Sequence, residues 1–312
     1  MNNLTTGLHH ITAIVGNAQR NYDFYTQALG LRFVKKTVNF DDPGTYHFYY
    51  GNYAAEPGTI LTFFPWANIR QGRAGIGQAT SIGYSVPEGA FGFWKERFDA
   101  LGIRSLSPTE RFGEPVLGFW DPDGLLLELT IPSISDSRLA HVTNEVPAEA
   151  ALKGFHQTTL SLQNIAPTAR ILTELLGYEP VITEGKYHRF VNPLATAGGI
   201  VDLLEEDGGR KGLNAAGTIH HVAFRVPDDT AEQALLEKIR SAGLQVTDPI
   251  DRNYFHSLYF REPGGVLFEI ATDMPGFMVD EPLDSLGESL KLPPQYEAYR
   301  EQILAVLPNL HQ

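Results

Sequence analysis

Two pairs of adjacent histidines and one glutamate are the residues in this sequence best suited to hold a metal ion. His9 and His10 open one short apolar segment, His220 and His221 open another, and Glu269 lies within a third. Side chains on a strand alternate between its two faces, so one histidine of each pair can face a shared site. Alternation places His10, His221 and Glu269 on the less apolar faces. Two histidines and one carboxylate with open positions are typical of non-haem Fe(II) sites that bind substrate and O2 together.

These residues must be positioned by four copies of one βαβββ unit. Each copy has a strand, an amphipathic helix that ends at a glycine, and then two or three further strands; the copies begin near residues 7, 79, 155 and 219. The helix-ending glycines recur at near-constant intervals, where a left-handed backbone is common: Gly30, Gly102, Gly177 and Gly243. A single such sheet has open edges, so the units should pair. The expected fold is α+β, with four tandem modules paired into two open-barrel sheets and a C-terminal helical tail.

The register of the repeats gives a second reason to choose the same ligands. Aligning the closing strands on their glycines places Glu269 opposite Thr62 of the first unit. If the first and fourth units pair, the four equivalent positions hold His10, Thr62, His221 and Glu269. Three of these are candidate metal ligands, and Thr62 leaves the fourth coordination position vacant. Two other pairings give weaker sets: His10, Thr62, Ser81 and Glu128 for the first and second units, and Gln157, Leu203, His221 and Glu269 for the third and fourth.

Four parts of the chain follow from the repeats. Residues 1–132 should form an N-terminal domain of two modules, 133–153 a polar linker with space for a short helix, 154–275 a C-terminal domain of two modules, and 276–312 a tail. The tail should contain a helix from about Gln295 to Val306, with an apolar face to bury. Either this helix only covers a sheet edge, or the preceding loop roofs the metal site with Leu290, Leu292, Pro293 and Pro294.

Composition excludes several classes of function. The net charge of −13 argues against nucleic acid or an anionic membrane as a partner. The absence of cysteine excludes disulfides, thiolate metal sites and a cysteine nucleophile. The first residues do not resemble a signal peptide, and no apolar stretch is long enough for a membrane span, so we expect a cytoplasmic protein.

Other candidate residues are expected to be structural. Glu128 has no partner histidine in the first strand of its own unit, and His156 matches the first rather than the second histidine of the pairs. His47, His188 and His256 are expected to be ordinary strand or loop residues, although His256 could line a cavity. The glycine-rich stretch at 72–80 leads into a strand instead of a helix, which argues against a nucleotide site.

Several longer segments show a family resemblance. Tandem βαβββ units with histidines in first strands and a glutamate in a last strand resemble the vicinal oxygen chelate superfamily, which includes glyoxalase I, fosfomycin-resistance proteins and extradiol dioxygenases. The sequence is most similar to the hydroquinone-type ring-cleaving dioxygenases. The similarity lies in LHHIT (8–12), FYTQALGLRFVKKTVNFDDPGTYHFYYG (24–51), TIHHVAFRV (218–226), DRNYFHSLYFREPGGVLFEIATDMPGF (251–277) and LPPQYEAYR (292–300).

The resemblance implies that the first and fourth units share the metal site, with His10, His221 and Glu269 as ligands. It also implies that five further residues support these ligands or contact the substrate: His9, Thr12, His220, Arg252 and Tyr259. Alternation instead places His9 and His220 on the apolar faces, opposite to the faces that carry His10 and His221. Without the resemblance, Arg252 could equally form a surface salt bridge and Tyr259 could be a packed strand aromatic.

The expected function is therefore that of a non-haem Fe(II)-dependent, ring-cleaving dioxygenase. It would act on a hydroquinone- or catechol-type aromatic and insert both atoms of O2; Mn(II) is an alternative metal, and the sequence allows a homo-oligomer. One rival is a glyoxalase-like lyase or isomerase, which usually has a fourth protein ligand where this chain has Thr62. The other is a binding protein without catalysis, although such proteins generally lack the full set of metal ligands.

Overall fold

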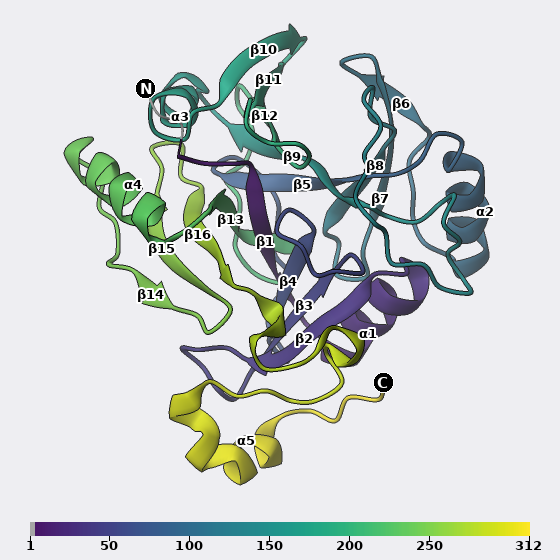
Figure 1. Cartoon of the computed structure of the whole chain (residues 1–312). Helices are drawn as coiled ribbons and strands as arrows, with labels where there is room; N and C mark the ends of the chain where they lie inside the picture. The colour runs from purple at the N-terminus through teal and green to yellow at the C-terminus, as the bar shows by residue number, and fades with distance from the viewer. Residues whose placement is uncertain (1–3) are drawn as a thin grey trace.

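The computed structural model describes residues 4–312, which form two curled eight-stranded sheets with helices on their outer sides (Figure 1). The first sheet contains the first and fourth modules. Its strands run in the order β14 (Ile250–Asp251), β15 (Phe255–Arg261), β16 (Leu267–Pro275), β13 (Thr218–Val226), β1 (Leu8–Val15), β4 (Ile60–Pro65), β3 (Tyr46–Gly51) and β2 (Arg32–Val38).

The second sheet contains the second and third modules in the same arrangement. Its strands run in the order β10 (Glu179–Glu184), β11 (Tyr187–Val191), β12 (Ile200–Glu205), β9 (Gly154–Leu162), β5 (Gln78–Ser85), β8 (Leu126–Thr130), β7 (Glu114–Trp120) and β6 (Thr109–Arg111). In each sheet the two central strands are antiparallel, and each pairs in parallel with the last strand of its own module. The α+β fold of paired modules that the repeats predicted is confirmed.

The helices of the four modules end one or two residues before the glycines that the repeats predicted. They are α1 (Ala18–Asp23), α2 (Phe91–Leu101), α3 (Ala166–Arg170) and α4 (Asp229–Ser241), and α1 and α3 each continue into a π-helical turn, at Phe24–Ala28 and Ile171–Leu175. Asn17 caps α1 and Asp228 caps α4, because each side chain accepts a hydrogen bond from a backbone N–H of the first turn. All four helix-ending glycines have a left-handed backbone, with φ between 64° and 79°. No helix within residues 4–312 has the length and apolar composition needed to cross a membrane.

The segment 133–153 is packed against both neighbouring modules. Its residues form turns, and the short helix that we considered there does not form. Trp94 donates to the Ala150 carbonyl at 2.9 Å, and Arg138 donates to the carbonyls of Gly58 and Phe155. The division of the chain at this segment remains a prediction, and each sheet takes one module from either side of it.

The tail lies along β2 and β3, at the foot of the molecule in Figure 1. It consists of 3-10 turns at Phe277–Val279, Leu283–Ser285 and Pro294–Tyr299, followed by α5 (Arg300–Val306). The Lys291 N–H donates to the Lys36 carbonyl at 2.9 Å, and the Tyr296 hydroxyl donates to the Phe40 carbonyl at 2.7 Å. The tail therefore covers the β2 edge of the first sheet and contacts the loop that follows this strand.

Candidate metal centre and cavity

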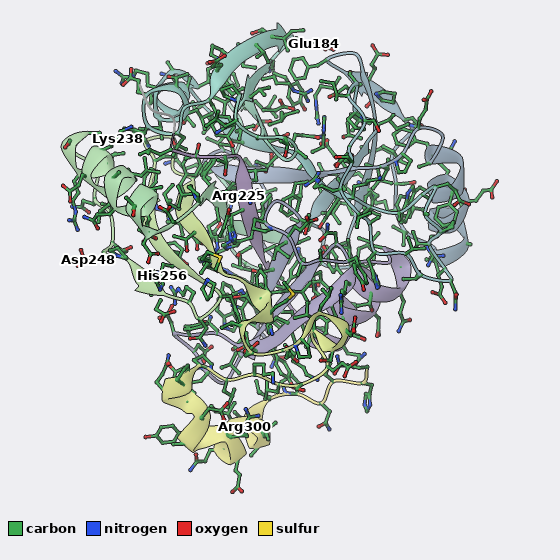
Figure 2. All side chains as sticks on the ribbon, in the orientation of Figure 1. Glu184, Arg225, Lys238, Asp248, His256 and Arg300 are labelled. Atoms are coloured by element: carbon green, nitrogen blue, oxygen red, sulfur yellow. The ribbon has the colours of Figure 1, made fainter. Side chains whose placement is uncertain are left out.

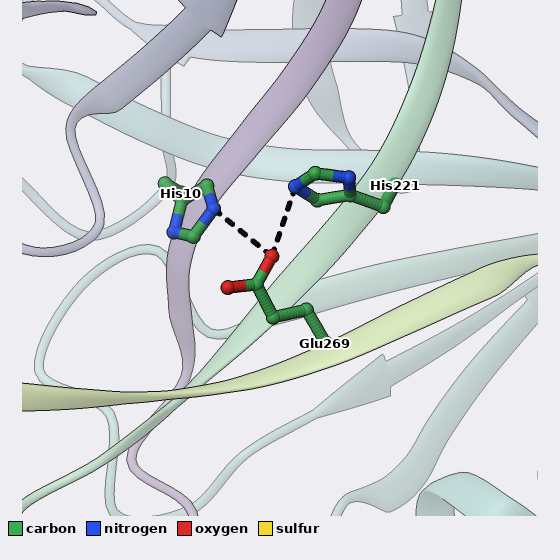
Figure 3. A group of neighbouring side chains, drawn as sticks. All are labelled: His10, His221 and Glu269. Atoms are coloured by element: carbon green, nitrogen blue, oxygen red, sulfur yellow. Dashed lines mark ion pairs between the residues drawn. The ribbon is translucent and has the colours of Figure 1, made fainter. Parts of the chain in front are cut away.

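His10, His221 and Glu269 meet on the concave face of the first sheet (Figure 3). They come from β1, β13 and β16, which are neighbours because the first and fourth modules pair. Nε2 of His10 lies 3.2 Å from Oε2 of Glu269, and Nε2 of His221 lies 2.9 Å from the same oxygen. All three side chains are buried, and their ligand atoms lie within 4.8 Å of one another. The structure thus brings together the three residues that alternation and register predicted as metal ligands.

The protonation states and the unmet polar atoms of this cluster fit a divalent cation. Nε2 of His221 and both carboxylate oxygens of Glu269 are buried without a hydrogen-bond partner, which is costly in a protein interior. Burial would raise the pKa of Glu269, but nearby His10 and His221 outweigh it and hold the pKa well below its usual value. Burial lowers the pKa of His221, which favours the neutral ring. A carboxylate and neutral imidazoles are the forms that bind a metal.

Each ligand histidine is oriented by the histidine that precedes it. Nδ1 of His10 lies 2.9 Å from Nδ1 of His9, and Nδ1 of His221 lies 2.8 Å from Nδ1 of His220. If Nε2 of each ligand is free for a metal, its Nδ1 carries the proton and donates to the preceding ring. His9 and His220 then carry their own protons on Nε2. This second hydrogen bond fixes the ring of the ligand, as in many metal sites.

The structure separates the roles of these two supporting histidines. His9 is buried and does not line the cavity beside the ligands, so its contact is with His10 and not with a substrate. His220 does line the cavity, despite its predicted apolar face. Burial, with the neighbouring His221, lowers the pKa of His220 to about 3, so this ring is neutral at pH 7.

Thr62, at the fourth position of the cluster, is held by a chain of hydrogen-bonded side chains. Thr62 lies beside Thr12 in the β1–β4 ladder, and their hydroxyls are 2.7 Å apart. Nε2 of His47 lies 2.9 Å from the Thr62 hydroxyl, and the Tyr49 hydroxyl lies 2.9 Å from Nδ1 of His47. Thr12 is fully buried and does not line the cavity. Its role is to hold Thr62, so direct contact with a substrate is not supported.

A cavity of about 400 Å³ opens directly onto the ligands, within the size range of small-molecule sites. It is lined by His10, His221, His220, His47, Tyr49, Phe64, Trp66, Phe255, Leu267, Arg252, Tyr259 and the loop 39–42. The Arg252 guanidinium lies over the rings of Phe40 and Tyr259, 5.4 Å from each centroid, and one of its nitrogens is 3.7 Å from Asp41. Burial raises the pKa of Tyr259, so its hydroxyl stays protonated. Arg252 and Tyr259 are therefore wall residues of this cavity.

Three parts of this wall were not predicted. His47, which we expected to be an ordinary strand residue, faces the cavity; the signal was its position on the strand next to Thr62. The roof is formed by the loop 39–42 and Trp66, and none of the tail residues expected to form it lines the cavity. The tail contacts the roof loop through the hydrogen bond from the Tyr296 hydroxyl to the Phe40 carbonyl. His256, a candidate cavity residue, instead pairs with Asp229 on the outer side of the sheet, near α4 (Figure 2).

A larger hollow, of about 1000 Å³, lies elsewhere, between the helices of the first and second modules. It contains Asp121 and Asp123, which already have protein partners: Asp121 accepts from Tyr25, and Asp123 pairs with Arg20. None of the predicted site residues lines it. Size alone therefore does not locate the chemistry, and the smaller cavity is the candidate active site.

Comparison with known proteins gives the family. A family model described as the Glyoxalase/Bleomycin resistance protein/Dioxygenase superfamily matches residues 7–129 and 136–270. MhqO of Bacillus subtilis (strain 168), provisionally named a ring-cleaving dioxygenase, is 47% identical over 299 residues, which cover 96% of this chain and 95% of MhqO. The chlorohydroquinone/hydroquinone 1,2-dioxygenase of Sphingobium indicum is 35% identical over 312 residues, which cover 96% and 95% of the two chains.

A solved structure agrees with these matches. The crystal structure of a provisionally named dioxygenase from Bacillus subtilis subsp. subtilis str. 168 has a TM-score of 0.95 and 45% identity, and the match covers 99% of this chain and 98% of that one. The relatives confirm the expectation of an enzyme of the ring-cleaving dioxygenase class. With a family model that matches most of its residues and relatives that match nearly all of them, the chain belongs to the glyoxalase/bleomycin resistance protein/dioxygenase superfamily.

Proposed function

We propose that this enzyme is a non-haem Fe(II)-dependent dioxygenase that opens the ring of a hydroquinone- or catechol-type aromatic and inserts both atoms of O2. The observation that carries the proposal is the buried cluster of His10, His221 and Glu269 at the base of a cavity that holds one cation, Arg252. The hydroquinone dioxygenase of Sphingobium indicum supports the substrate class. His10, His221 and Glu269 would hold the metal.

Bound Fe(II) would supply a Lewis acid that lowers the pKa of a ring hydroxyl, together with a path for electrons from the ring to O2. The cavity residues would do the rest. The Arg252 guanidinium would stabilise negative charge on a ring oxygen, because charge-assisted hydrogen bonds are strong in a partly dry site. The Tyr259 hydroxyl, which stays protonated, would donate to the same region. His220, which is neutral, would donate a hydrogen bond from its Nε2 proton to the substrate.

The open fourth position separates this proposal from a lyase. Because the Thr62 hydroxyl is held by Thr12 and His47, it is turned to its neighbours and leaves space for substrate and O2. Phe64, Trp66 and Phe255 supply apolar walls for an aromatic ring and limit access of water.

The proposal also covers the partners of the enzyme, its location, its oligomeric state and its division into domains. The expected partners are a small aromatic substrate and O2, and the net charge of −13 argues against nucleic acid or an anionic membrane. A cytoplasmic location, a homo-oligomeric state and the division into domains at 133–153 remain proposals of the same kind.

Metal reconstitution with a substrate panel tests this function. We expect protein purified without air and loaded with Fe(II) to take up about one O2 per ring on a hydroquinone or a catechol, since no external reductant is needed. Loading with Mn(II) in parallel shows which metal supports turnover. Isomerisation of a hemithioacetal without O2 uptake would favour the lyase, and tight binding of aromatics without turnover would favour a binding protein.

A further inference from the structure

The second sheet provides an internal comparison for the metal site in the first. In the fourth module, Tyr259 lies opposite Glu269 in the β15–β16 ladder, and in the second module Gly118 lies opposite Glu128 in the β7–β8 ladder. The same shift of 141 positions relates Gly118 to Tyr259 and Glu128 to Glu269. The same shift relates the hairpins at the edges of the two sheets. Glu110 lies opposite Pro115 in the β6–β7 hairpin, and Asp251 lies opposite His256 in the β14–β15 hairpin.

This shift makes Arg111 the counterpart of Arg252. The ladder between the first and last strands extends the comparison to the ligands. Gly83 pairs with Glu128 as Ala223 pairs with Glu269, so Ser81 stands in the place of His221. Thr159 pairs with Asp202 as Thr12 pairs with Thr62, so Gln157 stands in the place of His10.

The two arginines behave differently in the two sheets. Arg111 donates both terminal nitrogens to Glu128, at 3.1 Å and 2.6 Å, and both side chains are buried. Its guanidinium thus satisfies the carboxylate that corresponds to Glu269. Arg252 has no ion pair with Glu269 in the part of the chain that the structure describes, and its ion-pair partner is Asp41 on the roof loop.

One of the residues that differ between the two arrangements is the one opposite the carboxylate. Another is Asp202, which lies 3.6 Å from Arg111 and stands where the first sheet has Thr62. Gly118 has no side chain, and the Leu106 side chain lies 3.0 Å from where a Cβ on this glycine would be. Arg111 still reaches Glu128 with both terminal nitrogens. The Tyr259 ring has Arg252 over one face, 5.4 Å from its centroid, and it contacts His221 edge-on with ring centroids 5.7 Å apart. Tyr259 therefore lies among the arginine, a ligand histidine and the ligand carboxylate.

We propose that Tyr259 is a positioning residue that prevents Arg252 from pairing with Glu269 and so keeps this carboxylate available to a metal. The inference rests on the proposed function, because it assumes that Glu269 is a ligand. A bidentate guanidinium–carboxylate pair is among the stronger polar contacts in proteins, so it would compete with metal binding. An aromatic ring gives the guanidinium an alternative contact through its face.

Metal affinity of four variants tests the proposal without any measurement of turnover. Fe(II) binding is titrated without air against a coloured chelator for wild type, Tyr259→Gly, Tyr259→Phe and the double variant Tyr259→Gly/Arg252→Ala. We expect Tyr259→Gly to bind Fe(II) at least about tenfold more weakly, the order of effect seen when residues around metal ligands are changed. Tyr259→Phe keeps the ring and should stay within about threefold of wild type by the same comparison.

The double variant separates positioning from damage to the fold, because it carries the same glycine but lacks the competing guanidinium. We expect it to recover most of the lost affinity. Recovery would support the proposal, whereas a double variant as weak as Tyr259→Gly, or a Tyr259→Gly protein as tight as wild type, would overturn it. Tyr259→Ala and the double variant Tyr259→Ala/Arg252→Ala repeat the test, and alanine destabilises the strand less than glycine does. Wild type that binds no Fe(II) would instead contradict the proposed function.

Discussion

Replacing Glu269 with glutamine is expected to weaken Fe(II) binding by at least about 100-fold, since changes to residues outside the ligands already cost 10–100-fold. The substitution keeps the size of the side chain but removes the buried negative charge that pairs with His10 and His221. Oxygen uptake on a hydroquinone should fall to background for the same reason. Iron content after gel filtration and an oxygen electrode measure the two effects.

His10→Ala and His221→Ala should give the same two losses with the fold retained. His156→Gln is the matched control, because His156 is also a first-strand histidine next to a glutamate but belongs to the second sheet, where it lies 2.9 Å from Glu114. Its metal content should equal that of wild type. Full metal occupancy in any ligand variant would remove that residue from the site.

Arg111→Met is expected to destabilise the protein by about 3–5 kcal/mol, the usual cost of removing one partner of a buried ion pair. The substitution leaves Glu128 buried with only Gln157 and Ser81 as hydrogen-bond partners. Urea unfolding followed by circular dichroism measures the change in the free energy of unfolding.

The control for this prediction is Arg111→Met/Glu128→Leu, in which the stranded charge is also removed. It should regain part of the lost stability, because an apolar pair can replace a buried ion pair at little cost. Iron content per folded chain should be unchanged in both variants. If Arg111→Met lowers the free energy of unfolding by less than about 1 kcal/mol, the Arg111–Glu128 pair contributes no more than a solvent-exposed ion pair does, and the prediction is wrong.

The cluster of His10, His221 and Glu269 could be predicted from the sequence because side chains alternate regularly along a strand. Alternation selected one histidine of each pair, and the register of the repeats placed Thr62 as the vacancy, where the structure has it beside Thr12. Both arguments depend only on the period of a strand and on the pairing of modules. They fail for contacts that depend on side-chain direction, and His220 reaches the cavity although alternation placed it on the apolar face.

The roof of the cavity and the different partners of Arg111 and Arg252 could not be predicted from the sequence. The loop 39–42 closes the cavity because Trp66 donates to Asp42 and Tyr296 donates to the Phe40 carbonyl, which are contacts between segments far apart in the sequence. Glu128 was predicted to be structural, but its partner Arg111 could not be assigned because both arginines lie at similar sites in their modules. Only the contacts show that one guanidinium meets the carboxylate and the other does not.

Labelling with 18O2 tests the central claim most directly. Fe(II)-loaded wild-type protein is given a hydroquinone under 18O2, and the ring-opened product is analysed by mass spectrometry, with a parallel reaction in H2 18O under ordinary O2 to correct for exchange of carbonyl and carboxyl oxygens. Ring cleavage by a dioxygenase predicts that both atoms of one O2 molecule enter the same product molecule. A product with an intact ring, or one whose new oxygen comes only from water, would contradict this account.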